Sequence, residues 1–175
     1  MGDLKTGLAV VVALALGVST ITAAAAPGVS GLHKFTYKGA GTNHVNIQTG
    51  ELREHWAGRA DPFGKITAEV AGWIERPTPT TLTVHASMVI VDRDDAVLIG
   101  ACTGTGTLPL PDGAEDWTCH ATGGTGKFKH SHGSWGLHIK IHRVSNENGI
   151  QKNRFDETGA GRLSWNANTH ARRHQ

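Results

Sequence analysis

Histidine side chains gather in the second half of this sequence, where His120, His130 and His132 lie close together along the chain. Imidazole is a common ligand for zinc and copper. His130 and His132 share one face if the strand that contains them is continuous, because side chains of a strand alternate between its two faces. A transition-metal site is therefore one interpretation. The other is a solvated polar face on the outside of a sheet. We favour the solvated face and expect no bound metal.

Three further patterns resemble parts of known sites without completing them. The run Gly124–Lys127 resembles a phosphate-binding loop, but Ala121 and Phe128 occupy positions where that loop needs glycine and a hydroxyl residue. The run His132–Gly136 lacks the first glycine of a hydrolase elbow, which also requires a strand followed by a helix. The acidic run Asp92–Asp95 lacks the glycine and distal glutamate of a calcium loop. These patterns argue against nucleotide binding, serine hydrolysis and calcium binding.

Aromatic side chains offer a different kind of site. Trp135, Trp73 and Tyr37 are candidates to line a cavity for a small hydrophobic ligand, since the mouths of barrels are favoured binding places. The alternative is that they fill the core, because an eight-stranded barrel is just wide enough for its side chains to fill.

The sequence has two cysteines, Cys102 and Cys119. An oxidising compartment would favour a disulfide between them. The segment between them includes Leu108–Gly113, which reads as a connection between neighbouring strands. Two buried free thiols are the alternative, and no CxxC spacing indicates a metal pair.

The N-terminus has the pattern of a secretory signal peptide. Lys5 precedes the apolar run Leu8–Val18, and the small residues Ala23–Ala26 follow it. We expect cleavage after Ala24 or Ala25 and a secreted protein with no membrane span after signal removal; a retained N-terminal anchor is the alternative. The expected organisation is a signal peptide at 1–25, a flexible lead-in at 26–32, one β-barrel domain at 33–166 and a disordered tail at 167–175.

Charge and composition narrow the function classes. The chain has 175 residues and a formal net charge of +2, with acidic and basic residues interspersed. Nucleic-acid-binding domains usually gather their basic residues on one face, so no nucleic-acid partner is expected.

Short alternating segments separated by glycine and proline turns indicate an all-β barrel or sandwich of seven or eight strands. Glycines at 100, 104 and 106 share one face of an expected strand and suggest the curvature that closes a barrel. The segment Thr49–Asp61 is polar and is expected to be a loop or irregular, although Leu52 and Trp56 at a spacing of four permit a helical turn. The expected strands are His33–Lys38, Asn43–Gln48, Lys65–Glu75, Thr80–Val91, Ala96–Leu108, Trp117–Ala121, Trp135–Arg143 within a longer alternating segment, and Gly159–Trp165.

Several motifs, in their order, resemble secreted bacterial proteins of the allene oxide cyclase/dirigent-like family. They are Thr122–Phe128, Pro62–Thr67, Asp94–Gly100 with Thr103–Gly106, and Gly161–Trp165. The resemblance implies an eight-stranded antiparallel barrel of the calycin type and a trimeric assembly. It does not carry over the family's enzyme chemistry, because the catalytic glutamate motif of the plant cyclase has no match, and His55, Trp56 and Asp61 depart from it.

The function we expect is a secreted barrel that binds a small hydrophobic molecule or associates with the cell envelope, without catalysis and without a cofactor. The alternatives are a cofactor-free cyclase or isomerase that acts on a hydrophobic substrate in the lumen, and a histidine-rich metal binder. The lumen discriminates between the first two, because an enzyme needs a buried carboxylate or histidine with a perturbed pKa there.

Overall fold

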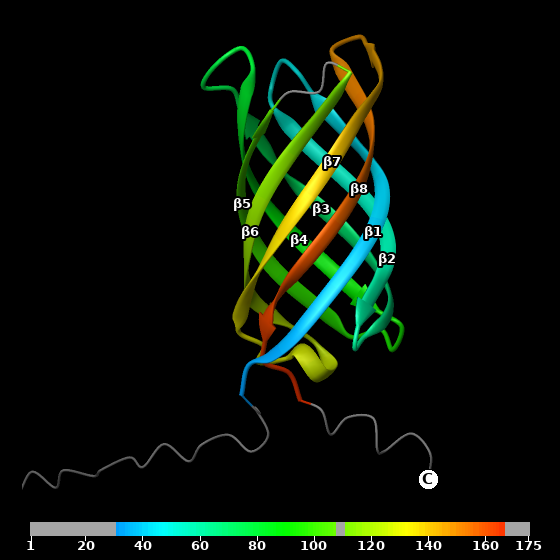
Figure 1. The fold of residues 1–175 in the computed structure, drawn as a ribbon, viewed down its shortest axis with the longest axis vertical. Coiled ribbons are helices and arrows are strands. Elements are labelled where there is room, and N and C mark those ends of the chain that lie inside the picture. Colours follow the sequence, from blue (N-terminus) through cyan, green and yellow to red (C-terminus); the bar gives the residue numbers. More distant parts are fainter. Residues whose placement is uncertain (1–30, 108–110, 167–175) are drawn as a thin grey trace, which may run out of the picture.

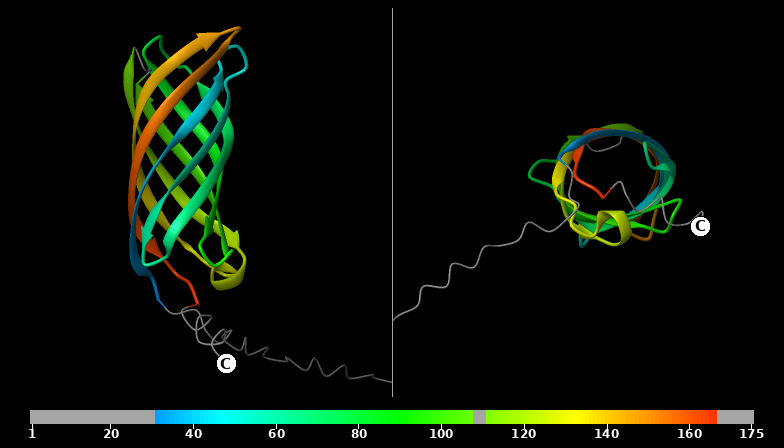
Figure 2. Two further views of the ribbon diagram at one scale, coloured as in Figure 1. Left: turned by 90° about the vertical axis from the view of Figure 1, so that its right-hand side faces the viewer. Right: turned by 90° about the horizontal axis from the view of Figure 1, so that it is seen from below.

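Eight antiparallel strands follow one another around a closed barrel in the computed structural model, which describes residues 31–107 and 111–166 (Figure 1). Each strand pairs with the next along the chain, and the last pairs with the first. This arrangement confirms the predicted eight-stranded antiparallel barrel, and Figure 2 shows the closed ring from below. The strands are β1 (His33–Asn46), β2 (Glu51–Asp61), β3 (Gly64–Glu75), β4 (Thr81–Asp92), β5 (Val97–Thr107), β6 (Asp112–Gly124), β7 (Gly133–Glu147) and β8 (Ile150–Leu163).

Alternation divides the strands into an interior and an exterior face, apart from register shifts in the β5–β6 and β7–β8 pairs. In β8, Gln151, Asn153, Phe155 and Glu157 are buried, whereas the residues between them are exposed. Because successive side chains of a strand point to opposite faces, every second residue of each strand enters the barrel. The interior is therefore built from residues far apart in the sequence.

The two ends of the barrel are built differently. The β1–β2, β3–β4, β5–β6 and β7–β8 connections lie at one end, which we call the upper end (Figure 1). The lower end holds the other connections, the first residues of β1, the last residues of β8 and a short 3-10 turn, η1 (Gly126–Phe128).

The structure corrects three expected strand boundaries. Residues Thr49–Asp61, expected as a loop, contain the eleven-residue strand β2. Asn43–Gln48 is not a separate strand, because its first half continues β1. The last strand begins at Ile150 rather than Gly159. In β2 and β8 several interior positions carry polar residues or glycine, and these hide the apolar alternation that identifies a half-buried strand.

The predicted disulfide is present. Cys102 on β5 and Cys119 on β6 are paired in the strand register and bonded to each other, with Cα atoms 4.0 Å apart. Both side chains face the interior and are buried. The bond therefore ties two neighbouring strands together inside the barrel.

Interior glycines make room for large aromatic side chains. A Cβ atom at Gly100 would lie 2.5 Å from the Trp135 ring, and one at Gly159 would overlap the Tyr37 ring. The glycines of β5, interpreted above as a sign of curvature, thus also give space to side chains of other strands. Aromatic side chains that cover strand glycines are a recognised device for pinning strand register.

Substitution of these glycines should therefore depend on the face. Gly159→Ala should lower the free energy of unfolding by about 1–3 kcal/mol, because overpacking forces side chains and backbone to shift. Gly136→Ala is the matched control, since a Cβ at Gly136 points outward and meets only the Trp117 carbonyl oxygen at 3.8 Å. Urea denaturation of both variants measures the difference, and equal losses would show that the Tyr37 ring does not fill this space.

The predicted signal peptide (1–25), residues 26–30 of the lead-in and the predicted tail (167–175) lie outside the described residues. Within the described part of the chain, no helix is long and apolar enough to cross a membrane.

Candidate functional site: the acidic interior

Three glutamates from separate strands face the interior and are almost completely buried. Glu54 of β2 is 2% exposed, Glu115 of β6 is 4% exposed and Glu157 of β8 is 1% exposed. They lie close enough that the charges of Glu115 and Glu157 influence the pKa of Glu54. We call these three residues the interior glutamate cluster. Acidic side chains are almost never fully buried without a partner, so this cluster is the main chemical feature of the interior.

A chain of amides leads from the upper end of the barrel to Glu54. Gln151 donates a hydrogen bond to Asn153 (3.0 Å), and Asn153 donates to the side-chain oxygen of Asn43 (2.6 Å). Asn43 in turn donates to Glu54 Oε1 at 3.1 Å. Strand register explains the chain, because Asn43 lies directly between Glu54 on β2 and Asn153 on β8. The amides hold one oxygen of Glu54 and leave Oε2 without a hydrogen-bond partner among the described residues.

The other two glutamates have different surroundings. The Trp117 indole N–H donates to Glu115 Oε2 at 2.7 Å. Neither oxygen of Glu157 has a hydrogen-bond partner within the described chain, although the Tyr37 hydroxyl lies beside it. Across the strand register, Glu157 faces Gly39 on β1 and Ile139 on β7. These neighbours offer its carboxyl no side-chain polar group, so Glu157 is the least satisfied of the three.

Aromatic rings complete the walls. Tyr37 and Trp56 are stacked with ring centroids 5.4 Å apart and nearly parallel planes. Phe35 packs between Tyr37 and Trp135, at 6.1 and 6.0 Å. The Trp56 indole N–H is buried without a hydrogen-bond partner in the described part of the chain. The Tyr37 hydroxyl and the Trp135 indole N–H make no hydrogen bond of good geometry there, although the Tyr37 hydroxyl lies beside both Glu157 and Trp135. Buried polar groups are normally paired, so each of these atoms requires an explanation.

Burial changes the acid–base behaviour of the interior. It raises the pKa of Glu115 to about 7, offset in part by the Trp117 hydrogen bond. It raises the pKa of Glu157 to about 8, offset in part by the Tyr37 hydroxyl. Burial, followed by the charges of the other two glutamates, raises the pKa of Glu54 well above its ordinary value. Removal of a carboxyl from water disfavours its charged form, so Glu157 is largely protonated at neutral pH and Glu115 is about half protonated.

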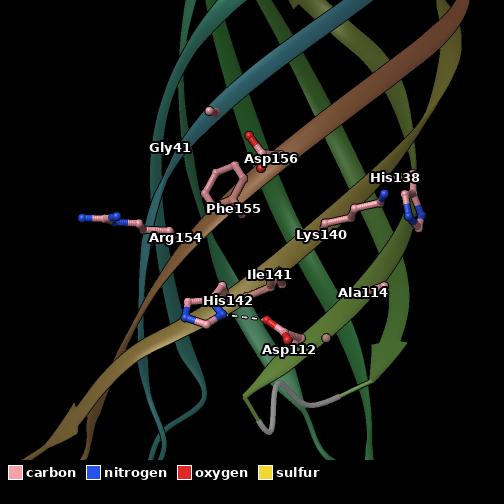
Figure 3. Close-up of a pocket in the computed structure, with 12 residues that line it drawn as sticks. Gly41, Asp112, Ala114, His138, Lys140, Ile141, His142, Arg154, Phe155 and Asp156 are labelled. Atoms are coloured by element: carbon pink, nitrogen blue, oxygen red, sulfur yellow. Dashed lines mark hydrogen bonds and ion pairs between the residues drawn. The ribbon is translucent and has the colours of Figure 1, made fainter.

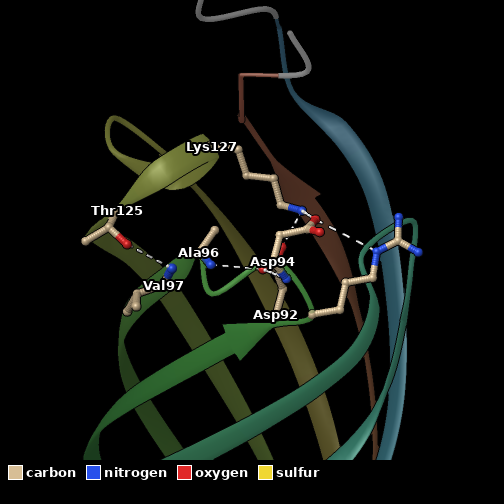
Figure 4. Close-up of polar contacts among 7 residues, drawn as sticks. Asp92, Asp94, Ala96, Val97, Thr125 and Lys127 are labelled. Carbon is tan, nitrogen blue, oxygen red and sulfur yellow. Dashed lines mark hydrogen bonds and ion pairs between the residues drawn. The ribbon is translucent and has the colours of Figure 1, made fainter. Parts of the chain in front are cut away.

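The lower end of the barrel is closed by a different set of contacts. Phe63 packs against Phe128 of η1 and against Trp165, with ring centroids 5.0 and 4.9 Å apart. Buried Lys127 forms an ion pair with Asp92 and lies 3.5 Å from Asp94 Oδ2 (Figure 4). The lysine of the phosphate-loop-like run thus pairs with two aspartates of the calcium-like run, and Arg93 also lies 3.8 Å from Asp94 Oδ2. Asp92, the first residue of the acidic run, is therefore buried rather than solvated.

A surface groove of about 610 Å³ on the outside of the barrel is a second polar feature of the described residues (Figure 3). It crosses β6, β7, β8 and β1. Its histidines are paired with aspartates: His142 Nδ1 lies 2.6 Å from Asp112, and His138 Nδ1 lies 2.8 Å from Asp116. Exposed pairs of this kind are common on sheet surfaces. Because its histidines are paired in this way, we regard the groove as a weaker candidate than the interior.

The candidate ligand-lining residues divide between the two faces. Tyr37 and Trp135 face the interior, as a lining role requires. Trp73 does not, since it is 52% exposed on the outside and stacks on His85 at 5.2 Å. The reason is alternation: the interior residues of β3 include Ile66 and Val70, and Trp73 is an odd number of residues away from both.

The candidate metal ligands do not converge. His130 and His132 lie between η1 and β7, so the continuous strand that would place them on one face is absent there. His132 Nδ1 instead lies 2.7 Å from the Ser164 hydroxyl, and His120 is exposed on β6. Residues 31–107 and 111–166 contain no group of three or more histidine, cysteine, aspartate or glutamate side chains that could hold a metal ion.

Sequence reasoning missed the interior glutamate cluster. The sequence does contain a sign of it, because each glutamate is two residues from a large apolar residue. Glu54 lies between Leu52 and Trp56 at this spacing, and Glu115 precedes Trp117. A polar residue within such a series still occupies the interior face, because register fixes the face regardless of residue type.

The fold and these side chains define a closed up-and-down barrel with an acidic and aromatic interior. Comparison with known proteins finds no significant match, whether with family models, with curated proteins or with solved structures.

Proposed function

We propose that the protein is a binding barrel that holds a small, largely apolar molecule with one polar group beside the interior glutamate cluster. The observation that carries this proposal is a set of buried polar atoms that make no hydrogen bond of good geometry within the described chain. They belong to Glu54, Glu157, Tyr37, Trp56 and Trp135. A purely structural barrel gains nothing from them, since an unsatisfied buried polar group costs about 1–3 kcal/mol. A ligand that pairs with these atoms would offset that cost.

We also propose that the protein is exported from the cell. It is supported by the apolar N-terminal segment and by the Cys102–Cys119 disulfide, which is typical of oxidising compartments. The resemblance of several sequence motifs to the allene oxide cyclase/dirigent-like family also supports a role in which the interior takes up hydrophobic molecules. Association with the cell envelope is compatible with this role.

Intrinsic fluorescence can test the binding proposal. We expect saturable changes in tryptophan emission, excited at 295 nm, when intact protein is titrated with 2-phenylethanol and with 2-phenylethylamine, whose phenyl groups do not absorb there. Trp56→Phe removes an interior indole N–H and should weaken binding of whichever probe binds. Trp73→Phe is the matched control on the outside and should bind as the wild type does. Equal binding by both variants would place the probes elsewhere, and no binding of either probe would contradict the proposal.

A second candidate function is cofactor-free proton transfer on a bound carbonyl compound. It is favoured by one observation, the burial of a glutamate with a pKa of about 8 beside the Tyr37 hydroxyl. A carboxyl with a pKa near the working pH suits general acid–base chemistry. Its test is the exchange of the α-hydrogens of phenylacetone for solvent deuterium, followed by NMR. Wild-type protein should accelerate the exchange and Glu157→Gln should not; equal rates would exclude this function for Glu157.

A further inference from the structure

The interior glutamate cluster has no basic partner. None of its three members forms an ion pair with a lysine, arginine or histidine of the described chain. Buried Lys127 forms ion pairs with Asp92 and Asp94 at the lower end of the barrel. Arg143, near the upper end of β7, makes no ion pair in the described structure. An ionised carboxylate buried without a positive partner is strongly disfavoured. The cluster therefore needs either protons or a cation from outside the chain.

The walls around the cluster suit an organic cation. Tyr37 and Trp56 present stacked rings with centroids 5.4 Å apart, and Trp135 stands near them across Phe35. A positive charge is attracted to the face of an aromatic ring, and this attraction is strongest where water is excluded. The rings also provide apolar surface for the body of the molecule.

A bare metal ion fits this interior poorly. No three acidic or metal-ligating side chains of the described residues converge on one point. Each glutamate instead belongs to a different strand and has different neighbours, namely an amide for Glu54, an indole for Glu115 and an aromatic hydroxyl for Glu157. Such separated acceptors match an extended molecule with an ammonium group rather than a compact ion.

We propose that the molecule held in the lumen is an organic monocation, an amine or quaternary ammonium compound with an apolar body, and that its binding displaces a proton from the interior glutamate cluster. This inference rests on the proposed binding function and specifies its ligand class. The proton leaves Glu157 as the ammonium arrives, so the charge inside the barrel is balanced before and after binding. Glu157 is the member assigned to this exchange because neither of its oxygens makes a hydrogen bond of good geometry in the described structure, and only the Tyr37 hydroxyl lies beside it.

Proton displacement gives the binding a defined pH dependence. The titratable groups that face the cluster are Tyr37 and the three glutamates themselves; Asp92 and Lys127 lie at the lower end, and Arg143 near the upper end. Burial raises the pKa of Glu157 to about 8, so Glu157 is protonated at pH 6 and a cation must expel that proton. The dissociation constant for a cation should fall up to about tenfold per pH unit between pH 6 and 8, and should level off above pH 8.

The experiment compares the probes 2-phenylethylamine and 2-phenylethanol, which differ mainly in charge, in fluorescence titrations of the intact disulfide-bonded protein at pH 6, 7 and 8. We expect the amine to bind at least tenfold more tightly than the alcohol at pH 8, and its affinity to rise with pH. Glu157→Gln should remove both the preference and the pH dependence. Glu75→Gln, an exposed exterior glutamate on β3, is the matched control and should keep both.

Calorimetry of the wild type provides a second measurement that does not depend on folding of the variant. Titrations with the amine in two buffers of different ionisation enthalpy should show release of about one proton per molecule bound at pH 7. Equal affinity for amine and alcohol, or absence of proton release, would overturn the cation inference and leave the binding function standing. If neither probe binds, both are overturned.

Discussion

The protein should be more stable at pH 5 than at pH 8.5, by several kcal/mol. Burial raises the pKa of Glu115 to about 7 and that of Glu157 to about 8, from an ordinary value of 4.5. The folded protein therefore keeps protons that the unfolded chain releases above pH 4.5. Raising the pH favours the unfolded chain until the folded groups have ionised too. One pKa unit corresponds to about 1.4 kcal/mol, so the two shifts together give an effect of this order.

Urea denaturation at pH 5, 6.5 and 8.5 measures this dependence. The double variant Glu115→Gln/Glu157→Gln should flatten it, because glutamine does not ionise. The control Glu51→Gln/Glu75→Gln changes two exposed glutamates and should leave the slope unchanged. A wild-type stability that stays constant or rises between pH 5 and pH 8.5 would show that the interior carboxyls are not held in their protonated form.

Lys127→Met should lower the free energy of unfolding by about 3–5 kcal/mol. The Lys127 side chain is 5% exposed and that of Asp92 is 1% exposed, and the two form an ion pair at the lower end of the barrel (Figure 4). Removal of one member of a buried pair leaves an uncompensated charge, which is strongly destabilising. Thermal or urea denaturation at pH 7 gives the value.

The double variant Lys127→Met/Asp92→Asn should recover a large part of this loss, because the buried charge is then removed as well. Asparagine can keep the contacts of Asp92 Oδ1, which accepts hydrogen bonds from the backbone N–H groups of Asp94 (2.9 Å) and Ala96 (3.0 Å). Lys129→Met, an exposed lysine two residues away, is the control and should change stability little. The account of the lower end fails if Lys127→Met costs no more than Lys129→Met.

Much of the fold could be predicted from the sequence, because most interior positions are apolar and alternate with polar ones. The strands β3, β4 and β5 were recognisable for this reason. The disulfide was predicted from two cysteines in a sequence whose N-terminus has the pattern of a secretory signal peptide. β2 was not recognisable, because its interior face includes Glu54 and Gly58. At such positions the residue type suggests exposure, whereas the fold places the side chain inside. Conflicts of this kind between local sequence and fold are concentrated at functional sites.

The candidate site was predicted only in part. Tyr37 and Trp135 were identified as aromatic residues suited to a lining role, and both face the interior. The glutamates could not be placed there, since a glutamate in a single sequence is normally read as exposed. The register that brings Glu54 beside Asn43, and both near residues of β8, becomes visible only when the barrel is closed.

The most direct test of the central claim is an NMR titration of protein labelled with ¹³C at the glutamate side-chain carboxyls, assigned with the single glutamate-to-glutamine variants. The account predicts that the signal of Glu115 titrates near pH 7, that of Glu157 near pH 8, and that of Glu54 well above 4.5. The exposed glutamates on the outside serve as internal references. If all glutamate signals titrate together near pH 4.5, the acidic interior does not exist as described, and the binding function proposed for it falls as well.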